Sequence, residues 1–186
     1  MKFFSGDILN SGATIICHQV NCMGVMGSGL ALQIKNKFPE VFGDYWNAVN
    51  LLNNECFGGC LVSKRNDGQG YIANLFSQYF YKGIYKTTDE YVNSGVDPFK
   101  LPEINTDYTV DTRFTNYEAL YRSLKNLRDK KIKYLLDEGK INESDRIAFP
   151  YQMGSNRGGG DWNIVKTMID SIFSNTEFRI EIWQKI

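Results

Sequence analysis

The sequence of 186 residues has one histidine, four prolines and no excess of either charge. Lysine plus arginine and aspartate plus glutamate number 21 each, so the formal net charge is zero. This balance argues against a dedicated nucleic-acid-binding protein, which is usually basic overall. No apolar run approaches the roughly 20 residues that cross a bilayer, and the first ten residues lack a leader pattern. We therefore expect a cytoplasmic protein that binds neither membrane nor nucleic acid.

The sequence is also poor in candidate metal ligands. Cys56 and Cys60 are close together, but their spacing fits no common zinc pattern, and His18 is the only histidine. In a cytoplasmic protein the four cysteines are expected to be free thiols. We expect no metal and no cofactor.

Short apolar or β-rich runs alternate with helical patterns along the chain. Strands are expected at 2–4, 14–17, 60–63, 71–76, 147–149 and 179–183, and helices at 30–38, 39–50, 114–136 and 162–173. This alternation predicts an α/β fold with three α/β/α layers around a central mixed sheet of about six strands. We expect one domain over residues 1–186, with a long surface excursion at about 79–113.

Two glycine-rich segments each follow an expected strand and precede an expected helix. The first holds Gly24, Gly27 and Gly29, and the second runs from Gly154 to Gly160. Glycines let the backbone approach a ligand, and the N-terminus of the following helix favours an anion. Two such loops could hold a diphosphate between them, although each can also be interpreted as a flexible turn. Neither is a Walker A sequence or a good dinucleotide fingerprint.

Three segments carry a more specific pattern: Gly6-Asp7-Ile8, then His18-Gln19-Val20-Asn21-Cys22 leading into Gly24-Val25-Met26-Gly27-Ser28-Gly29-Leu30-Ala31, and the loop from Gly154 to Trp162. Together they resemble a macrodomain of the small bacterial and phage branch, which is similar to the yeast-type ADP-ribose-1″-phosphate phosphatases. The resemblance covers most of the chain. The second of these loops, from Gly154 to Trp162, is called the late loop below. It departs from the usual Gly-Cys-Gly-Leu type at Ser155-Asn156-Arg157.

The resemblance implies a site for ADP-ribose, or for a phosphorylated or conjugated derivative, in a protein that we expect to be a monomer. Asp7 would accept a hydrogen bond from the adenine amino group, and Ile8 would offer its backbone N–H; on sequence alone, Asp7 is equally a turn former or cap. Asn21 would contact the distal ribose. The diphosphate and distal ribose would lie against these residues: Gly24, Val25, Met26, Gly27, Ser28, Gly29, Gly154, Ser155, Asn156, Arg157 and Gly158. Arg157 is as readily a solvated surface arginine.

The candidate catalytic residues are His18, Asn21 and Asp161. The pattern places His18 at the end of a strand, where it is either a general acid/base or nucleophile near a terminal phosphate, or a hydrogen-bonded core histidine. Asp161 is either its partner or an N-cap of the last helix.

The resemblance implies that the glycohydrolase branch that cleaves ADP-ribose from guanine, thymine or glutamate uses a lysine and an aspartate, which this chain lacks at the matching positions. Gln78 stands in place of the lysine and Gly158 in place of the aspartate. A glutamine carries no charge and forms no Schiff base. Three hypotheses remain: an ADP-ribose-1″-phosphate phosphatase, which we expect, a non-catalytic binder of ADP-ribose or another NAD-derived signal, and a de-ADP-ribosylating hydrolase.

Overall fold

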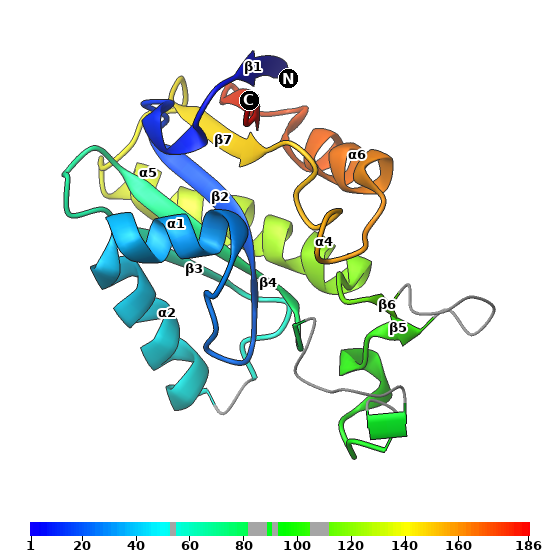
Figure 1. Cartoon of the computed structure of the whole chain (residues 1–186). Helices are drawn as coiled ribbons and strands as arrows, with labels where there is room; N and C mark the ends of the chain where they lie inside the picture. The colour runs from blue at the N-terminus through cyan, green and yellow to red at the C-terminus, as the bar shows by residue number, and fades with distance from the viewer. Residues whose placement is uncertain (53–54, 82–88, 91–92, 105–111) are drawn as a thin grey trace.

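The sheet is built from six strands in the order β1-β8-β7-β2-β4-β3 (Figure 1). The computed structural model describes residues 1–52, 55–81, 89–90, 93–104 and 112–186. Neighbouring strands of this sheet run parallel, except that β3 and β4 are antiparallel. The strands are β1 (Lys2–Ser5), β2 (Ile15–Asn21), β3 (Cys60–Lys64), β4 (Tyr71–Gln78), β7 (Arg146–Pro150) and β8 (Arg179–Gln184).

Helices cover both faces of the sheet and complete the three α/β/α layers that the sequence predicts. Helices α1 and α2 pack on one face, whereas α4, α5 and α6 pack on the other (Figure 1). The helical segments are η1 (Ile8–Asn10), α1 (Gly29–Lys37), α2 (Pro39–Leu51), η2 (Pro98–Lys100), α4 (Tyr117–Asn126), the π-helical η3 (Leu127–Ile132), α5 (Lys133–Asp137) and α6 (Trp162–Phe173).

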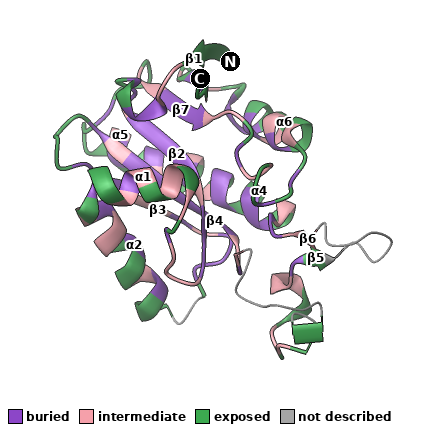
Figure 2. Cartoon of the chain, in the orientation of Figure 1, coloured by how far each residue is buried: buried purple, intermediate pink, exposed green. Residues whose placement is uncertain are grey.

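The central strands β2 and β4 are buried on both faces, as strands covered by helices on either side must be (Figure 2). Successive side chains of β2 point to opposite faces. Ile15 and Cys17 pack with the α4–α6 layer, and Ile16 packs with α1 and α2. This double burial fixes the register of β2, so the residues at its carboxyl end have a defined position.

Strand β2 is longer than its apolar run predicts, and this corrects the placement of His18. The strand continues to Asn21, so His18 lies in its interior rather than at its end. His18 pairs in register with Asn74 of β4, and their side chains share a 2.7 Å hydrogen bond. A polar residue is tolerated in a buried strand when it is bonded in this way.

The excursion expected at about 79–113 lies partly outside the described residues. Its described part contains η2 and two short antiparallel strands, β5 (Glu103–Ile104) and β6 (Thr112–Arg113). The helix expected from residue 114 begins at Tyr117, because the Asn116 side chain caps it by accepting from the Ala119 N–H.

Candidate functional site

The two glycine-rich loops begin at neighbouring parallel strands and lead to opposite faces of the sheet. The chain passes from β2 to α1 on one face, and from β7 to α6 on the other. Such a switch point leaves a crevice beyond the carboxyl ends of the strands, where α/β proteins bind ligands. A cleft of about 430 Å³ lies there, within the roughly 300–1,000 Å³ of small-molecule sites.

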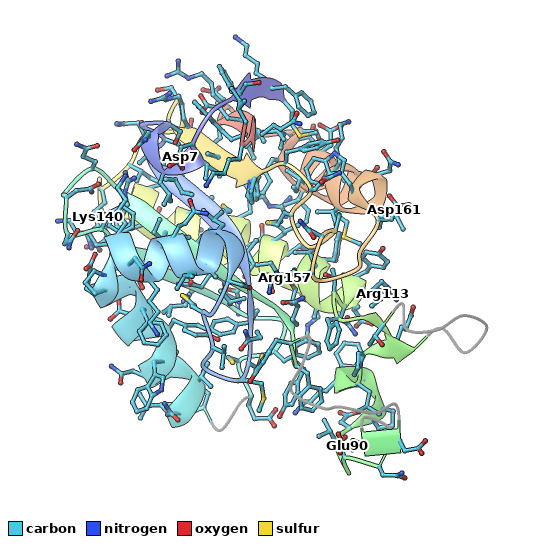
Figure 3. The ribbon with its side chains drawn as sticks, in the orientation of Figure 1. Asp7, Glu90, Arg113, Lys140, Arg157 and Asp161 are labelled. Atoms are coloured by element: carbon cyan, nitrogen blue, oxygen red, sulfur yellow. The ribbon has the colours of Figure 1, made fainter. Side chains whose placement is uncertain are left out.

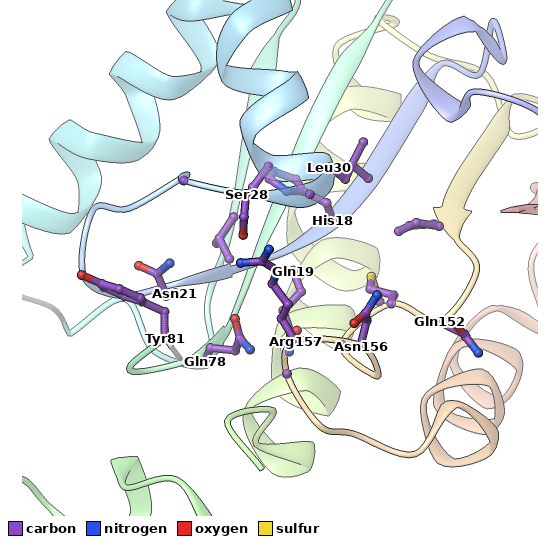
Figure 4. Close-up of a pocket in the computed structure, with 18 of the residues that line it drawn as sticks. His18, Gln19, Asn21, Ser28, Leu30, Gln78, Tyr81, Gln152, Asn156 and Arg157 are labelled. Atoms are coloured by element: carbon purple, nitrogen blue, oxygen red, sulfur yellow. The ribbon is translucent and has the colours of Figure 1, made fainter. Parts of the chain in front are cut away.

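The cleft is lined by both loops and by the ends of β2, β4 and β7 (Figure 4). Among its described lining residues only Arg157 carries a formal charge at neutral pH, and none is Asp, Glu or Lys. Five of the lining side chains are amides. The lining residues are His18, Gln19, Val20, Asn21, Val25, Gly27, Ser28, Gly29, Leu30, Ala31, Gln78, Tyr81, Pro150, Tyr151, Gln152, Met153, Gly154, Asn156, Arg157 and Gly158.

The side chain of Asn21 organises the first loop. Its Oδ1 accepts hydrogen bonds from the N–H groups of Met23 (2.9 Å) and Val25 (3.3 Å), and its Nδ2 donates to the Val25 carbonyl (2.6 Å). The buried Tyr45 hydroxyl lies 2.9 Å from both the Oδ1 and the carbonyl oxygen of Asn21. Burial raises the pKa of Tyr45 well above its usual value, so the hydroxyl stays protonated and can donate. Asn21 thus ties the first loop to itself and to Tyr45 of α2.

The N-terminus of α1 opens into the cleft. Ser28 is the N-cap residue, but its side chain makes no capping hydrogen bond. Residues 28–31 line the cleft, and the first turn of α1 contains no acidic residue. The unpaired N–H groups and positive end of a helix dipole at such a position attract an anion. A phosphate group suits this end of the cleft.

The late loop closes on itself by a backbone hydrogen bond from Gly160 N–H to the Gly154 carbonyl, at 2.9 Å. The N–H groups of Asn156, Arg157 and Gly158 have no partner among the described residues. Gly158 cannot carry a side chain here, because an added Cβ would lie 2.5 Å from the Gly154 oxygen and 2.8 Å from Gln78 Nε2. The loop therefore has backbone donors without a described partner, and its Arg157 side chain lines the cleft (Figure 4).

His18 contributes to the cleft wall but is only 2% exposed. Burial lowers the pKa of His18 to about 4, despite the opposing hydrogen bond with Asn74. The imidazole is therefore neutral at pH 7. Its Nδ1 is buried and has no partner among the described residues.

Asp161 and Asp7 both cap helical segments (Figure 3). Asp161 accepts from the Asn163 N–H at 2.7 Å and begins α6, so the N-cap interpretation of Asp161 agrees with the structure. Asp7 accepts from the Leu9 N–H at 2.9 Å and caps η1. Neither carboxylate is among the groups that line the cleft.

The structure thus brings together most of the expected site residues, but not all of them. His18, Asn21, Val25, Gly27, Ser28, Gly29, Gly154, Asn156, Arg157 and Gly158 line the cleft. The expected site residues outside its lining are Asp7, Ile8, Gly24, Met26, Ser155 and Asp161.

Sequence reasoning missed several polar and aromatic lining residues. Gln19 follows His18 in the strand that leads to the first loop, Gln152 precedes the late loop, and Tyr81 lies just after β4. Figure 4 shows Tyr81 beside Asn21 and shows Gln152 on the opposite side of the cleft. For Gln19 and Gln152 the available signal was their proximity to the glycine loops in sequence, whereas Tyr81 lies far from both loops in sequence.

Two other classes of site find no support among the described residues. No group of three or more His, Cys, Asp or Glu side chains is placed to hold a metal ion in this part of the chain. Within the same residues, no helix has the length and apolar character needed to cross a bilayer.

Comparison with curated proteins gives two short matches, to proteins of the same name from two mycobacteria, and one long match, whereas no family model matches the chain. A stretch of 48 residues, 26% of this chain, is 48% identical to the DNA ADP-ribosyl glycohydrolase of Mycobacterium tuberculosis but spans only 14% of that protein. The whole chain aligns over 191 positions, at 24% identity, with 98% of an uncharacterised 17.5 kDa protein from the tk-vs intergenic region of Enterobacteria phage T4.

Solved structures share the fold over nearly the whole chain. The macrodomain of Mycobacterium tuberculosis DarG superposes with a TM-score of 0.66 at 22% identity, covering 98% of this chain and 95% of that one. Thermosipho africanus DarTG in complex with ADP-ribose gives 0.65 at 18% identity, covering 98% of this chain and 41% of that one. At these identities the likeness concerns the fold. The chain has a macrodomain fold.

Proposed function

We propose that this chain binds ADP-ribose, or a derivative modified at its distal ribose, in the cleft between residues 21–31 and 150–158. The observation that carries the proposal is the cleft itself, which is lined by two glycine loops and by a helix N-terminus that has no side-chain cap hydrogen bond. A diphosphate is the anion that such a two-sided arrangement fits. The structural likeness to DarTG in complex with ADP-ribose supports the same ligand.

Arg157 adds the single formal charge among the described lining residues. A guanidinium can bind phosphate oxygens through two parallel N–H groups, which gives direction as well as energy. With no lining carboxylate described, nothing in this part of the cleft repels the ligand's two negative charges. The chemistry therefore favours a stable complex with the diphosphate.

Binding without turnover agrees best with these residues. General acid–base catalysis needs a group whose pKa lies near the working pH. His18 has a pKa of about 4 and is bonded to Asn74, and Asp161 caps α6 outside the cleft lining. These positions give little support to the phosphatase hypothesis, which depends on His18 and Asp161.

A hydrolytic step at the distal ribose is the second candidate. The observation that favours it is the 48-residue match, at 48% identity, to a DNA ADP-ribosyl glycohydrolase. Gln78 and Gly158 line the cleft, and by the sequence resemblance they stand where that type of chemistry would need a lysine and an aspartate. A hydrolase of this kind would need a different catalytic set.

A binding and turnover assay on one panel of ligands separates the candidates. ADP-ribose, ADP-ribose-1″-phosphate and ADP-ribosylated DNA are each titrated and then incubated with the protein. The proposal predicts binding of ADP-ribose with no product released. Release of phosphate or of free ADP-ribose would replace it by the matching hydrolase. Absence of binding to every ligand would refute the site assignment.

A further inference from the structure

A partly buried set of hydrogen bonds links β2 and β4 to the late loop. The Gln19 Nε2 donates to Ser77 Oγ on β4 at 2.8 Å and to Thr115 Oγ1 at 3.1 Å. The Thr115 hydroxyl in turn donates to the Gly154 carbonyl at 2.7 Å. Thr115 and Ser77 are both fully buried. Because Gln19 and Gly154 both line the cleft, these hydrogen bonds connect β2 to the late loop on the two sides of the cleft lining.

The backbone around Thr115 holds the same loop a second time. The N–H groups of Phe114 and Thr115 both donate to the Gly158 carbonyl, each at 2.9 Å. The next residue, Asn116, donates its N–H to the Ser77 carbonyl at 2.9 Å, which fixes the segment to β4. Residues 114–116 therefore bind the late loop at two points, the carbonyl groups of Gly154 and Gly158.

Three glycines of the late loop pack directly around the Thr115 side chain. A Cβ added at Gly158 would lie 2.3 Å from Thr115 Oγ1, and one at Gly154 would lie 3.0 Å from the same atom. A Cβ at Gly160 would lie 3.3 Å from Thr115 Cβ. The sequence pattern predicts that these glycines let the backbone approach a ligand. In the structure their lack of a side chain also makes room for Thr115.

We propose that Thr115 is a positioning residue for the ligand site: it does not line the cleft, but its hydroxyl and backbone set the position of the late loop against the bound diphosphate. This assignment builds on the proposed function. The N–H groups of Asn156, Arg157 and Gly158 can meet a phosphate only if the loop is held at a fixed distance from the first loop. Thr115 fixes the distance between the two loops through its 2.7 Å hydrogen bond to the Gly154 carbonyl.

Two substitutions at Thr115 separate the hydroxyl from the shape of the side chain. Thr115→Val keeps the shape but places a methyl group 2.7 Å from the Gly154 oxygen, where a carbon needs roughly 3.3 Å. The loop must then move by several tenths of an ångström. We expect the Kd for ADP-ribose to rise about tenfold. Thr115→Ser keeps the donor and should stay within about twofold of the wild type.

Ser123→Ala is the matched control, because Ser123 also carries a fully buried hydroxyl, which donates to the Ala119 carbonyl on α4 at 2.8 Å. It should lower the unfolding temperature without changing the Kd. Equal weakening of ADP-ribose binding by Ser123→Ala and Thr115→Val would overturn the inference, as would an unchanged Kd in Thr115→Val or a serine variant as weak as the valine one.

Hydrogen exchange in the ligand-free proteins tests the inference independently of ADP-ribose. The Gly160 amide, which closes the late loop, should exchange several-fold faster in Thr115→Val, whereas amides in the middle of β2 should not change. Unchanged exchange at Gly160 would overturn the inference. If the wild type fails to bind ADP-ribose, the proposed function is wrong, and the exchange result still decides whether Thr115 holds the loop.

Discussion

Replacing Asn21 by alanine tests whether its side chain acts by organising the first loop or by touching the ligand. The substitution removes the partner of the Met23 N–H and of the Val25 carbonyl. Each buried group left unpaired costs about 1–3 kcal/mol. Both groups are only partly buried, so we expect the lower end of this range, about 2 kcal/mol of unfolding free energy for the two. ADP-ribose binding should weaken by at least about tenfold.

Tyr45→Phe separates the two roles of Asn21. Tyr45 is fully buried and does not line the cleft, and its hydroxyl contacts Asn21 and the backbone of the first loop at Gly24 and Val25. If Asn21 holds the loop, losing this hydrogen bond should cost about 0.5–1.5 kcal/mol of stability and should also weaken ADP-ribose binding by a few-fold. The double variant should be weaker than Asn21→Ala by less than the effect of Tyr45→Phe alone, since both changes remove the contact between the Tyr45 hydroxyl and Asn21 Oδ1.

The assay is a double-mutant cycle in which calorimetry gives the Kd for ADP-ribose and urea denaturation gives the unfolding free energy. Unaltered ligand affinity in Tyr45→Phe, together with strict additivity in the double variant, would refute the loop-organising role. Asn21 would then act by direct contact with the ligand.

Three further changes test other parts of the account. Burial lowers the pKa of His18 to about 4, so as the pH falls the unfolded chain takes up this proton before the folded one, and the unfolding free energy of the wild type should drop by about 3 kcal/mol between pH 6.5 and 4. His18→Gln should lack this drop. Parallel pH profiles of the two proteins in urea denaturation would contradict this. Gly158→Ala should distort the late loop and abolish ADP-ribose binding. In the control Gly43→Ala in α2, an added Cβ meets nothing within 4 Å, so this change should stabilise the folded protein by about 0.5–1 kcal/mol. Normal calorimetric binding of ADP-ribose by Gly158→Ala would refute the packing argument. Asp7→Ala should weaken adenine-containing ligands by about 1.5–3 kcal/mol and leave ribose-5-phosphate unaffected; equal weakening of both ligands would assign Asp7 to folding.

The sequence predicts the layers and both loops well because the relevant signals are local. Helix α6 occupies the expected range 162–173, where Asp161 caps the first turn and the apolar residues follow a helical period. Likewise, Pro39 begins α2 as expected. Glycines between a strand and a helix show where each loop lies.

The roles of individual polar residues depend on partners far away in the sequence, and these were not predictable. The sequence pattern places His18 at the end of a strand, because it does not show that Asn74 of β4 forms a hydrogen bond with His18 inside the sheet. The contact of Asn21 with Tyr45 of α2, which ties the first loop to that helix, is likewise absent from the local pattern. Local periodicity carries no information about such pairs, because packing of the sheet against the helices brings them together.

The central claim is that a diphosphate ligand lies between the two loops, and calorimetry on the wild type and Gly27→Glu tests it most directly. Gly27 lines the cleft, and an added Cβ would meet only Val25 Cγ1, at an ordinary 3.5 Å, so the fold should accept a side chain there. The wild type should bind ADP-ribose with micromolar affinity, about −8 kcal/mol. Gly27→Glu should unfold at the same temperature but give no binding heat, because its carboxylate occupies the diphosphate position. A wild type that gives no heat, or a folded Gly27→Glu that binds normally, would contradict the claim.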